Sequence, residues 1–150
     1  MNGFLGEFEA TLDAKGRFLL PAGFKKQLSE SDAYRFVINR GFEKCLSFYP
    51  ISTWLPLEDK INALNDFDPK VRQFKRMFLN GATLVEPDSA GRILLPASLK
   101  EYAHLEKNIV MVPAGNKMEI WDQDEYKKFF DSFTPESFSD LANEVMGFLK

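Results

Sequence analysis

The stretch DAKGRFLLPA at residues 13–22 decides the fold, because the chain says nearly the same thing again as DSAGRILLPA at residues 88–97. Seven of the ten positions are identical, and the two copies start 75 residues apart in a chain of 150. Self-similarity at a fixed spacing is the signature of a repeated structural unit. The sequence therefore predicts two copies of one small unit, at about residues 5–50 and 82–122.

The shared residues of the two copies have the chemistry of a tight turn. An Asp side chain can accept hydrogen bonds from the backbone two residues later, and Gly adopts positive φ without a Cβ clash. A Pro ends the strand that follows, since it cannot donate to a ladder, and it can begin a helix. The predicted structural turn residues are Asp13, Gly16 and Pro21 in the first copy, and Asp88, Gly91 and Pro96 in the second.

In the first copy, residues 7–12 alternate polar and apolar side chains, which is typical of a half-buried strand. We expect this strand to form a tight hairpin with residues 17–20. A short helix over residues 22–28 should follow, and residues 36–38 and 45–49 should form a second hairpin. The unit is thus a strand, a turn, a strand, a short helix and a hairpin.

The second copy repeats this order. Residues 83–85 and 93–95 are the predicted strands around the turn, and residues 98–103 are the predicted short helix. Residues 109–112 and 118–121 should form the closing hairpin. Together the copies predict a mainly β protein with short helices, of the α+β class, in a single domain over residues 1–150.

Two further segments should be helical. Residues 52–80 form a predicted linker whose second helix has Asp68 as its N-cap, Pro69 at its first position and Gly81 after its end. The tail over residues 123–150 has aromatic and aliphatic side chains at helical spacing. The linker's second helix also has a basic face, formed by Lys70, Arg72, Lys75 and Arg76. That face is either an ordinary solvated surface or a binding surface.

The charge is unevenly distributed along the chain. The net charge is −3, but residues 1–80 hold 12 Lys and Arg against 10 Asp and Glu, and residues 81–150 hold 7 against 12. A site for a polyanion is therefore expected in the first copy. With no leader peptide and no long apolar run, we expect a cytoplasmic protein without a membrane partner.

The composition offers little for catalysis. Cys45 and His104 are the only residues of their types, so neither a metal cluster nor a Cys/His pair is expected. The two loop aspartates could form a carboxylate dyad like that of an acid protease, but turn formation already accounts for both. We therefore predict no enzyme, no cofactor, no metal and no small-molecule substrate.

A turn does not require Arg after its Gly, yet Arg17 and Arg92 hold that place in both copies. Arg presents a planar fork that fits a carboxylate, a phosphate or the edge of guanine. The partner is therefore either an acidic side chain within the fold or a nucleic acid outside it. In the first copy Lys15, Lys25 and Lys26 add positive charge and favour phosphate, whereas Ala90 stands in the place of Lys15 in the second.

The doubled D-x-x-G-R-x-x-x-P motif resembles that of the MraZ family of bacterial transcriptional regulators. The resemblance covers about residues 1–122 and includes LSFYP near position 50, F-x-x-x-F-L-x-G at 74–81 and EIW at 119–121. It implies an AbrB-like fold, in which the two repeats form an intrachain pseudo-twofold swapped-hairpin β-barrel with connecting helices. Nothing carries over to the tail.

The resemblance also implies a function. Members of this family are repressors that form closed rings and bind short direct repeats in the promoter of the division and cell-wall gene cluster. Carried over to this sequence, Lys15 and Arg17 are the DNA contacts, and Arg92 occupies the matching place. We then expect a nucleoid-associated protein whose partners are promoter DNA and itself. The alternative is an interaction module whose Arg loops and Phe-rich tail serve only assembly.

Overall fold

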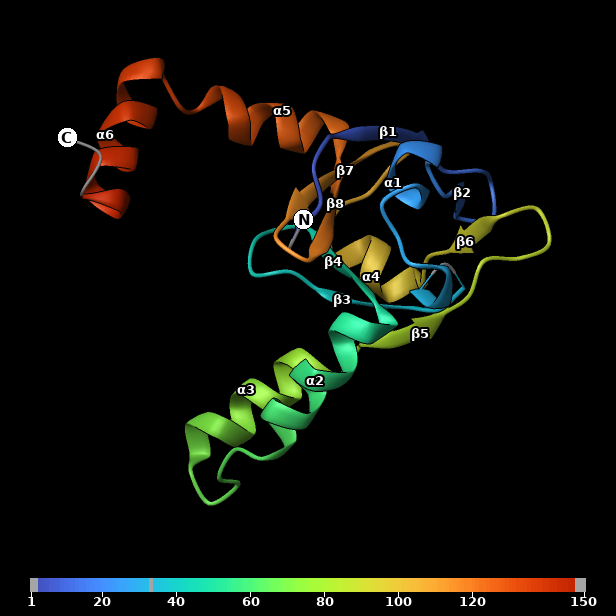
Figure 1. The fold of residues 1–150 in the computed structure, drawn as a ribbon, viewed down its shortest axis with the longest axis horizontal. Coiled ribbons are helices and arrows are strands. Elements are labelled where there is room, and N and C mark those ends of the chain that lie inside the picture. The colour runs from blue at the N-terminus through green and yellow to red at the C-terminus, as the bar shows by residue number, and fades with distance from the viewer. Residues whose placement is uncertain (1–2, 33, 148–150) are drawn as a thin grey trace.

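The computed structural model describes residues 3–32 and 34–147, and it is mostly antiparallel sheet with several short helices, as predicted (Figure 1). Six strands form one sheet in the order β1-β7-β8-β4-β3-β5, and two form a ribbon, β2-β6. The strands are β1 (Phe8–Thr11), β2 (Arg17–Leu19), β3 (Phe36–Arg40), β4 (Leu46–Pro50), β5 (Thr83–Val85), β6 (Arg92–Leu94), β7 (Asn108–Ala114) and β8 (Lys117–Asp122).

The strand order has an internal twofold symmetry. β1 of the first repeat pairs with β7 of the second, and the equivalent strand β5 of the second repeat pairs with β3 of the first. β4 pairs with β8, and β2 with β6, so each of these strands lies against its own repeat equivalent. The two repeats are therefore intertwined around a pseudo-twofold axis, while closure of the strands into a barrel stays a prediction.

One pairing predicted from the sequence is wrong. The strand over residues 7–12 does not form a hairpin with residues 17–20, because β1 pairs with β7 and β2 pairs with β6. The turn between them does form, with the Gly16 N–H donating to the Asp13 carbonyl at 3.0 Å. The closing hairpins β3–β4 and β7–β8 are as predicted.

The helices lie at the ends and edges of the sheet. Helix α1 (Ala22–Lys25) is shorter than the predicted 22–28, and Lys26 is its C-cap. A 3-10 turn, η1 (Glu30–Asp32), follows it. The others are α2 (Ile51–Asn62), α3 (Pro69–Leu79), α4 (Ala97–Tyr102), α5 (Gln123–Asp131) and α6 (Pro135–Met146). Residues 148–150 of the predicted tail lie outside the described residues.

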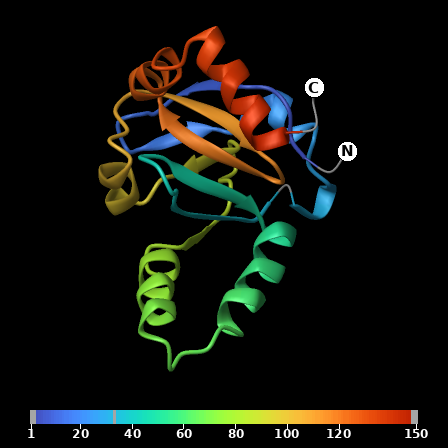
Figure 2. The ribbon, with the colours of Figure 1, turned by 90° about the vertical axis from the view of Figure 1, so that its left-hand side faces the viewer.

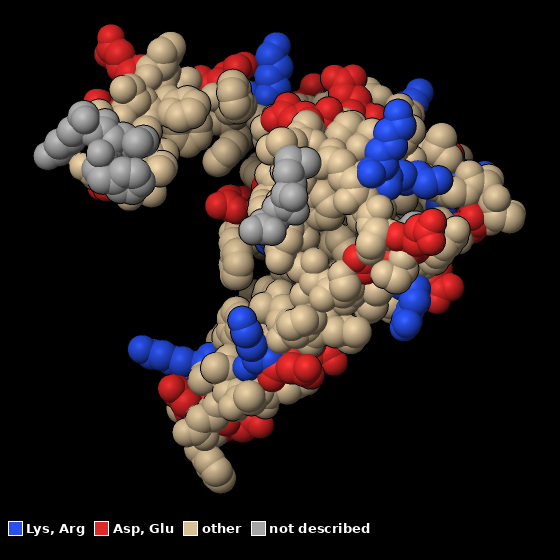
Figure 3. Space-filling view, in the orientation of Figure 1, with Lys and Arg blue, Asp and Glu red and all other residues tan. Residues whose placement is uncertain are grey.

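Two segments project from the body. Helices α2 and α3 form a hairpin, called here the α2–α3 hairpin, that extends away from the sheet (Figure 2). Asp68 caps α3 and Pro69 begins it, as predicted. The α5–α6 tail extends in another direction, and open space separates the two projections in Figure 3.

Both repeats contribute to one apolar core. Phe18 and Phe24 of the first repeat are buried in it with Ile93 and Leu99, their equivalents in the second. A second cluster, around Trp54 and Phe78, joins the α2–α3 hairpin to the sheet. A third cluster, around Trp121, anchors α5. Because the main core is shared, the loop and strand geometry of each repeat depends on residues of the other.

Candidate nucleic-acid interface

The first loop is organised by the carboxylate of Asp13. Its Oδ1 accepts hydrogen bonds from the backbone N–H groups of Lys15 at 3.0 Å and Arg17 at 2.9 Å. Its Oδ2 accepts from Nε of the Arg17 side chain at 2.7 Å. Gly16 closes the turn at a φ of +82°, a conformation that suits glycine. Asp13 thus shapes the backbone and holds the arginine at the same time.

The second loop repeats this geometry. The Oδ1 atom of Asp88 accepts from the N–H groups of Ala90 at 3.0 Å and Arg92 at 2.9 Å, and its Oδ2 accepts from Nε of Arg92 at 2.9 Å. Gly91 has the same φ of +82°. Each arginine therefore has an acidic partner inside its own loop. Within residues 3–32 and 34–147 the terminal Nη groups of both arginines donate to no protein atom, so they are available to a ligand.

The electrostatics of the two carboxylates match this geometry. The Arg17 backbone N–H, followed by the Arg17 side chain and the Lys15 N–H, holds the pKa of Asp13 below its ordinary value. The corresponding groups of Arg92 and Ala90 lower the pKa of Asp88. A dyad that shares a proton needs one carboxyl with a raised pKa. Two ionised carboxylates, each bound by its own loop, favour the turn interpretation over a catalytic one.

The ribbon places both arginines on one face. In the β2–β6 register, Arg17 is opposite Leu94, Phe18 is opposite Ile93, and Leu19 is opposite Arg92. Phe18 and Ile93 are buried, so the alternating residues on either side of them face outward. The outward face of the ribbon therefore carries two arginines with two exposed leucines, Leu19 and Leu94, between them.

The helix that follows each loop flanks the other loop. The N–H of Leu95 donates to the Gly16 carbonyl at 3.0 Å, so α4 begins beside the first loop. The Lys100 side chain of α4 lies against Gly16, where a Cβ would be 3.2 Å from its Nζ. Conversely, the N–H of Leu20 donates to the Gly91 carbonyl at 3.1 Å, so α1 begins beside the second loop.

This exchange changes how the predicted basic residues are grouped. Lys15 and Arg17 belong to the first loop, but Lys25 and Lys26 are carried by α1, whose start is bonded to the second loop. Lys100 was not among the residues predicted from the sequence, although it stands 75 positions after Lys25 in the repeat. Each loop is thus supplied with cations from both repeats.

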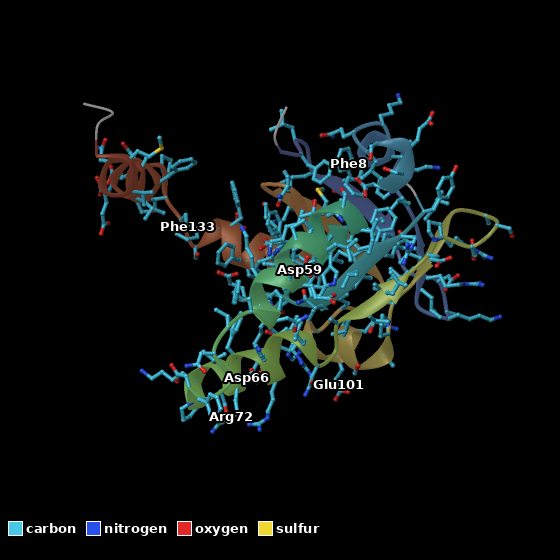
Figure 4. All side chains as sticks on the ribbon, turned by 60° about the horizontal axis from the view of Figure 1, so that its bottom comes forward. Phe8, Asp59, Asp66, Arg72, Glu101 and Phe133 are labelled. Atoms are coloured by element: carbon cyan, nitrogen blue, oxygen red, sulfur yellow. The ribbon has the colours of Figure 1, made fainter. Side chains whose placement is uncertain are left out.

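The basic face of α3 is partly used within the α2–α3 hairpin. Nη1 of Arg72 donates to the carbonyls of Asp66 at 2.9 Å and Phe67 at 3.3 Å. Nζ of Lys75 forms a 2.6 Å ion pair with Asp66. These contacts fix the loop between α2 and α3, and Lys70 and Arg76 remain exposed. Figure 4 shows Asp66 and Arg72 together at the outer end of the hairpin.

One acidic cluster could be mistaken for a metal centre. Glu43, Cys45 and Glu119 bring one ligand atom each within 4.8 Å of one another. Burial, with the nearby carboxylates, raises the pKa of the Cys45 thiol to about 12. The thiol is therefore protonated at neutral pH, whereas metals bind the thiolate. We assign no metal to this cluster.

Within the described part of the chain, no helix combines the length and the apolar character needed to cross a bilayer.

The intertwined repeats and the matched cationic loops define the class: a two-repeat β protein with a cationic ribbon at its pseudo-twofold axis. A family model described as "MraZ protein, putative antitoxin-like" matches residues 4–77 and 78–149. A protein of Cytophaga hutchinsonii named "Transcriptional regulator MraZ" is 42% identical over 146 residues, covering 97% of this chain and 96% of that protein. The chain belongs to the MraZ family, whose members are transcriptional regulators rather than enzymes. The resemblance predicted from the doubled motif is confirmed.

Proposed function

We propose that this transcriptional regulator is a sequence-specific DNA-binding repressor that reads DNA with the β2–β6 ribbon and its two loops. The observation that carries the proposal is the pair of arginines, Arg17 and Arg92, on one outward face of a two-stranded ribbon. The major groove of DNA admits such a ribbon, and an Arg fork bonds guanine at two acceptors. The bond from Asp13 or Asp88 to each Nε leaves the fork free and oriented.

The lysines have a different part in the proposal. Lys15 at the apex of the first loop and Lys100 beside Gly16 neutralise phosphates at that loop. Lys25 and Lys26 do so from α1 at the second loop, where Ala90 leaves the apex uncharged. An acidic chain can bind DNA in this way because the local charge, and not the net charge, meets the phosphates.

One ribbon makes only a few contacts, so repeated contacts are needed for firm binding. The family resemblance implies a ring of subunits on short direct repeats in the promoter of the division and cell-wall gene cluster. Subunits linked in one assembly bind successive DNA repeats as intramolecular steps, which raises avidity by about 10²–10⁴ without a new contact. We propose this arrangement for the chain, acting at the nucleoid.

The test is the variant Arg17→Ala, compared with the matched Arg92→Ala. Loss of a bidentate base contact costs about 1–3 kcal/mol, or roughly 5-fold to 150-fold in dissociation constant for each engaged loop. Fluorescence anisotropy on promoter DNA and on a scrambled duplex measures the loss and its dependence on sequence. A far-UV circular dichroism spectrum checks that both variants are folded. Unchanged promoter binding by both would show that the ribbon does not read DNA.

The α5–α6 tail supports a second candidate, in which the chain serves only assembly. Large apolar side chains are exposed there, with Phe138 at 66% and Val145 at 75%. Native mass and an electrophoretic shift with promoter DNA separate the two functions. An assembly that shifts no DNA would favour the interaction module.

A further inference from the structure

The elbow between α5 and α6 encloses an apolar pocket of about 570 Å³. Phe129, Phe130 and Phe133 of the α5 side line it together with Phe138 and Leu141 of α6, and each of these side chains is at least 42% exposed. Figure 4 shows Phe133 at this elbow. Exposed apolar patches of this kind mark interaction sites.

The rest of the chain does not cover this pocket. Contacts of Trp121 with Tyr126 and Phe129 anchor α5 to β8, at ring centroid distances of 5.6 and 5.1 Å. Among the described residues, the hydrogen bonds of α6 and its cap stay within residues 134–147. The elbow is thus held in place at one end, while its apolar side lacks a partner.

The charge on α6 limits what its partner can be. Glu136, Asp140 and Glu144 lie in this helix, and no Lys or Arg does. A surface that docks here should therefore combine apolar side chains with positive charge.

The end of the α2–α3 hairpin has this combination. Phe67, between the two helices, is 93% exposed. Helix α3, which follows it, contains Lys70, Arg72, Lys75 and Arg76 and no acidic residue. The bonds of Arg72 and Lys75 to the loop hold the backbone around Phe67 in one conformation, so less ordering entropy is lost when Phe67 is bound.

We propose that the α5–α6 elbow binds the α2–α3 hairpin of a second copy of this chain. Phe67 of one copy enters the apolar pocket of the other, and basic α3 lies against acidic α6. The two surfaces are different, so each copy can bind one neighbour at its elbow and another at its hairpin. Such head-to-tail contacts close into a ring or extend as a filament. The contact deepens the proposed function, and only its use on promoter DNA rests on that function.

The first test measures the mass of the full chain without DNA, by light scattering over a range of concentrations. The unaltered chain is expected to assemble beyond a dimer. Phe67→Ser and Phe133→Ser should each weaken assembly by at least about thirtyfold, as the loss of a central anchor does. Phe42→Ser is the matched control, because Phe42 is 78% exposed but lies in the β3–β4 turn. A monomeric unaltered chain, or assembly that survives Phe67→Ser, overturns the proposal.

The second test reverses charge. One variant carries Glu136→Lys, Asp140→Lys and Glu144→Lys, and the other carries Lys70→Glu and Arg76→Glu. Each should remain unassembled alone, because its own elbow and hairpin now carry like charge. A mixture should assemble, because each elbow then meets a hairpin of opposite charge on the other variant. A mixture that stays apart, with both variants folded by circular dichroism, contradicts the contact. If the unaltered chain assembles but binds no promoter DNA, the proposed function fails and the contact stands.

Discussion

At the scale of single residues, the loop aspartates have two tasks that cannot be separated. Asp13 accepts from backbone N–H groups to form the turn and from Nε of Arg17 to orient the side chain. A partly exposed ion pair of this kind contributes little to stability. Its value lies in geometry, because the Nη groups of a held arginine have fewer orientations to lose on binding.

The first prediction at this scale concerns Lys100. Each phosphate contact contributes about 0.9 to the slope of log K against log salt concentration on duplex DNA. Lys100→Ala should therefore lower that slope by about 0.9 for each engaged first loop, and should weaken promoter and scrambled DNA about equally. Anisotropy titrations at several salt concentrations measure this. Lys44→Ala is the control, because Lys44 is exposed in the β3–β4 turn.

The result with Lys25→Ala distinguishes the two loops. Lys25 holds the equivalent place in the repeat and is carried by the helix that begins beside the second loop. A loss of slope from Lys100→Ala alone indicates contact by the first loop, and a loss from both indicates contact by both. No change of slope with Lys100→Ala removes that residue from the interface.

The turn residues could be predicted from the sequence, whereas the grouping of the lysines could not. Asp13 and Gly16 act within four residues of chain, so their types and spacing suffice. Lys100 reaches Gly16 only because the strands of the two repeats exchange partners. Local patterns contain no information about that exchange, so a lysine distant in sequence was overlooked.

At the scale of elements, the start of α2 depends on a residue from another segment. The N-cap position is Pro50, which has no side-chain hydrogen bond to offer. Asp32 supplies one instead, since its Oδ1 accepts from the N–H of Ser52 at 3.0 Å and its Oδ2 accepts from the Ser52 hydroxyl at 2.6 Å. Burial alone would raise the pKa of Asp32, but the bonds from Ser52 and Ser29 lower it below its ordinary value.

The prediction at this scale is that Asp32→Ala lowers the free energy of unfolding by about 1 kcal/mol, as loss of a helix cap does. Because the pKa of Asp32 is lower in the folded chain, its contribution is present above the ordinary value of 3.8 and is lost as the pH falls below it. Urea unfolding at pH 7 and at about pH 3 measures both effects. Asp59→Ala, an exposed change in α2, should leave stability nearly unchanged. Equal stability of the two variants at pH 7 contradicts the capping role.

Element types and most boundaries followed from the sequence, because Pro and Gly mark where strands and helices end. The predicted β1–β2 hairpin was wrong for a physical reason. A tight turn brings two strands near each other, but ladder partners are chosen by burial of their apolar faces. The shared core places β1 beside β7 and β2 beside β6, and no local pattern shows this.

At the scale of the whole molecule, the intertwined core makes each repeat depend on the other. Strand β1 has its partner β7 in the second repeat, and β5 has its partner β3 in the first. We propose that the chain unfolds as one unit for this reason, in keeping with a single domain over residues 1–150.

The prediction at this scale uses the chain cut in two, as residues 1–81 and 82–150. Neither piece alone should form a folded monomer, because each lacks the partner of one strand and half of the core. Expressed together, the pieces should form a folded complex with one copy of each. Circular dichroism and native mass measure this, and a folded monomeric piece would contradict the shared core.

The crossing of α1 and α4 between the loops also constrains how a duplicated chain can diverge. After duplication, a substitution at position 100 in the second half alters the surroundings of the loop in the first half, and one at position 25 does the reverse. Selection on either loop therefore acts on both halves of the chain. The second loop has lost its apex lysine at Ala90, yet its neighbouring helix has Lys26 where the helix beside the first loop has Glu101. The two halves have thus diverged in sequence while sharing the positive charge between them.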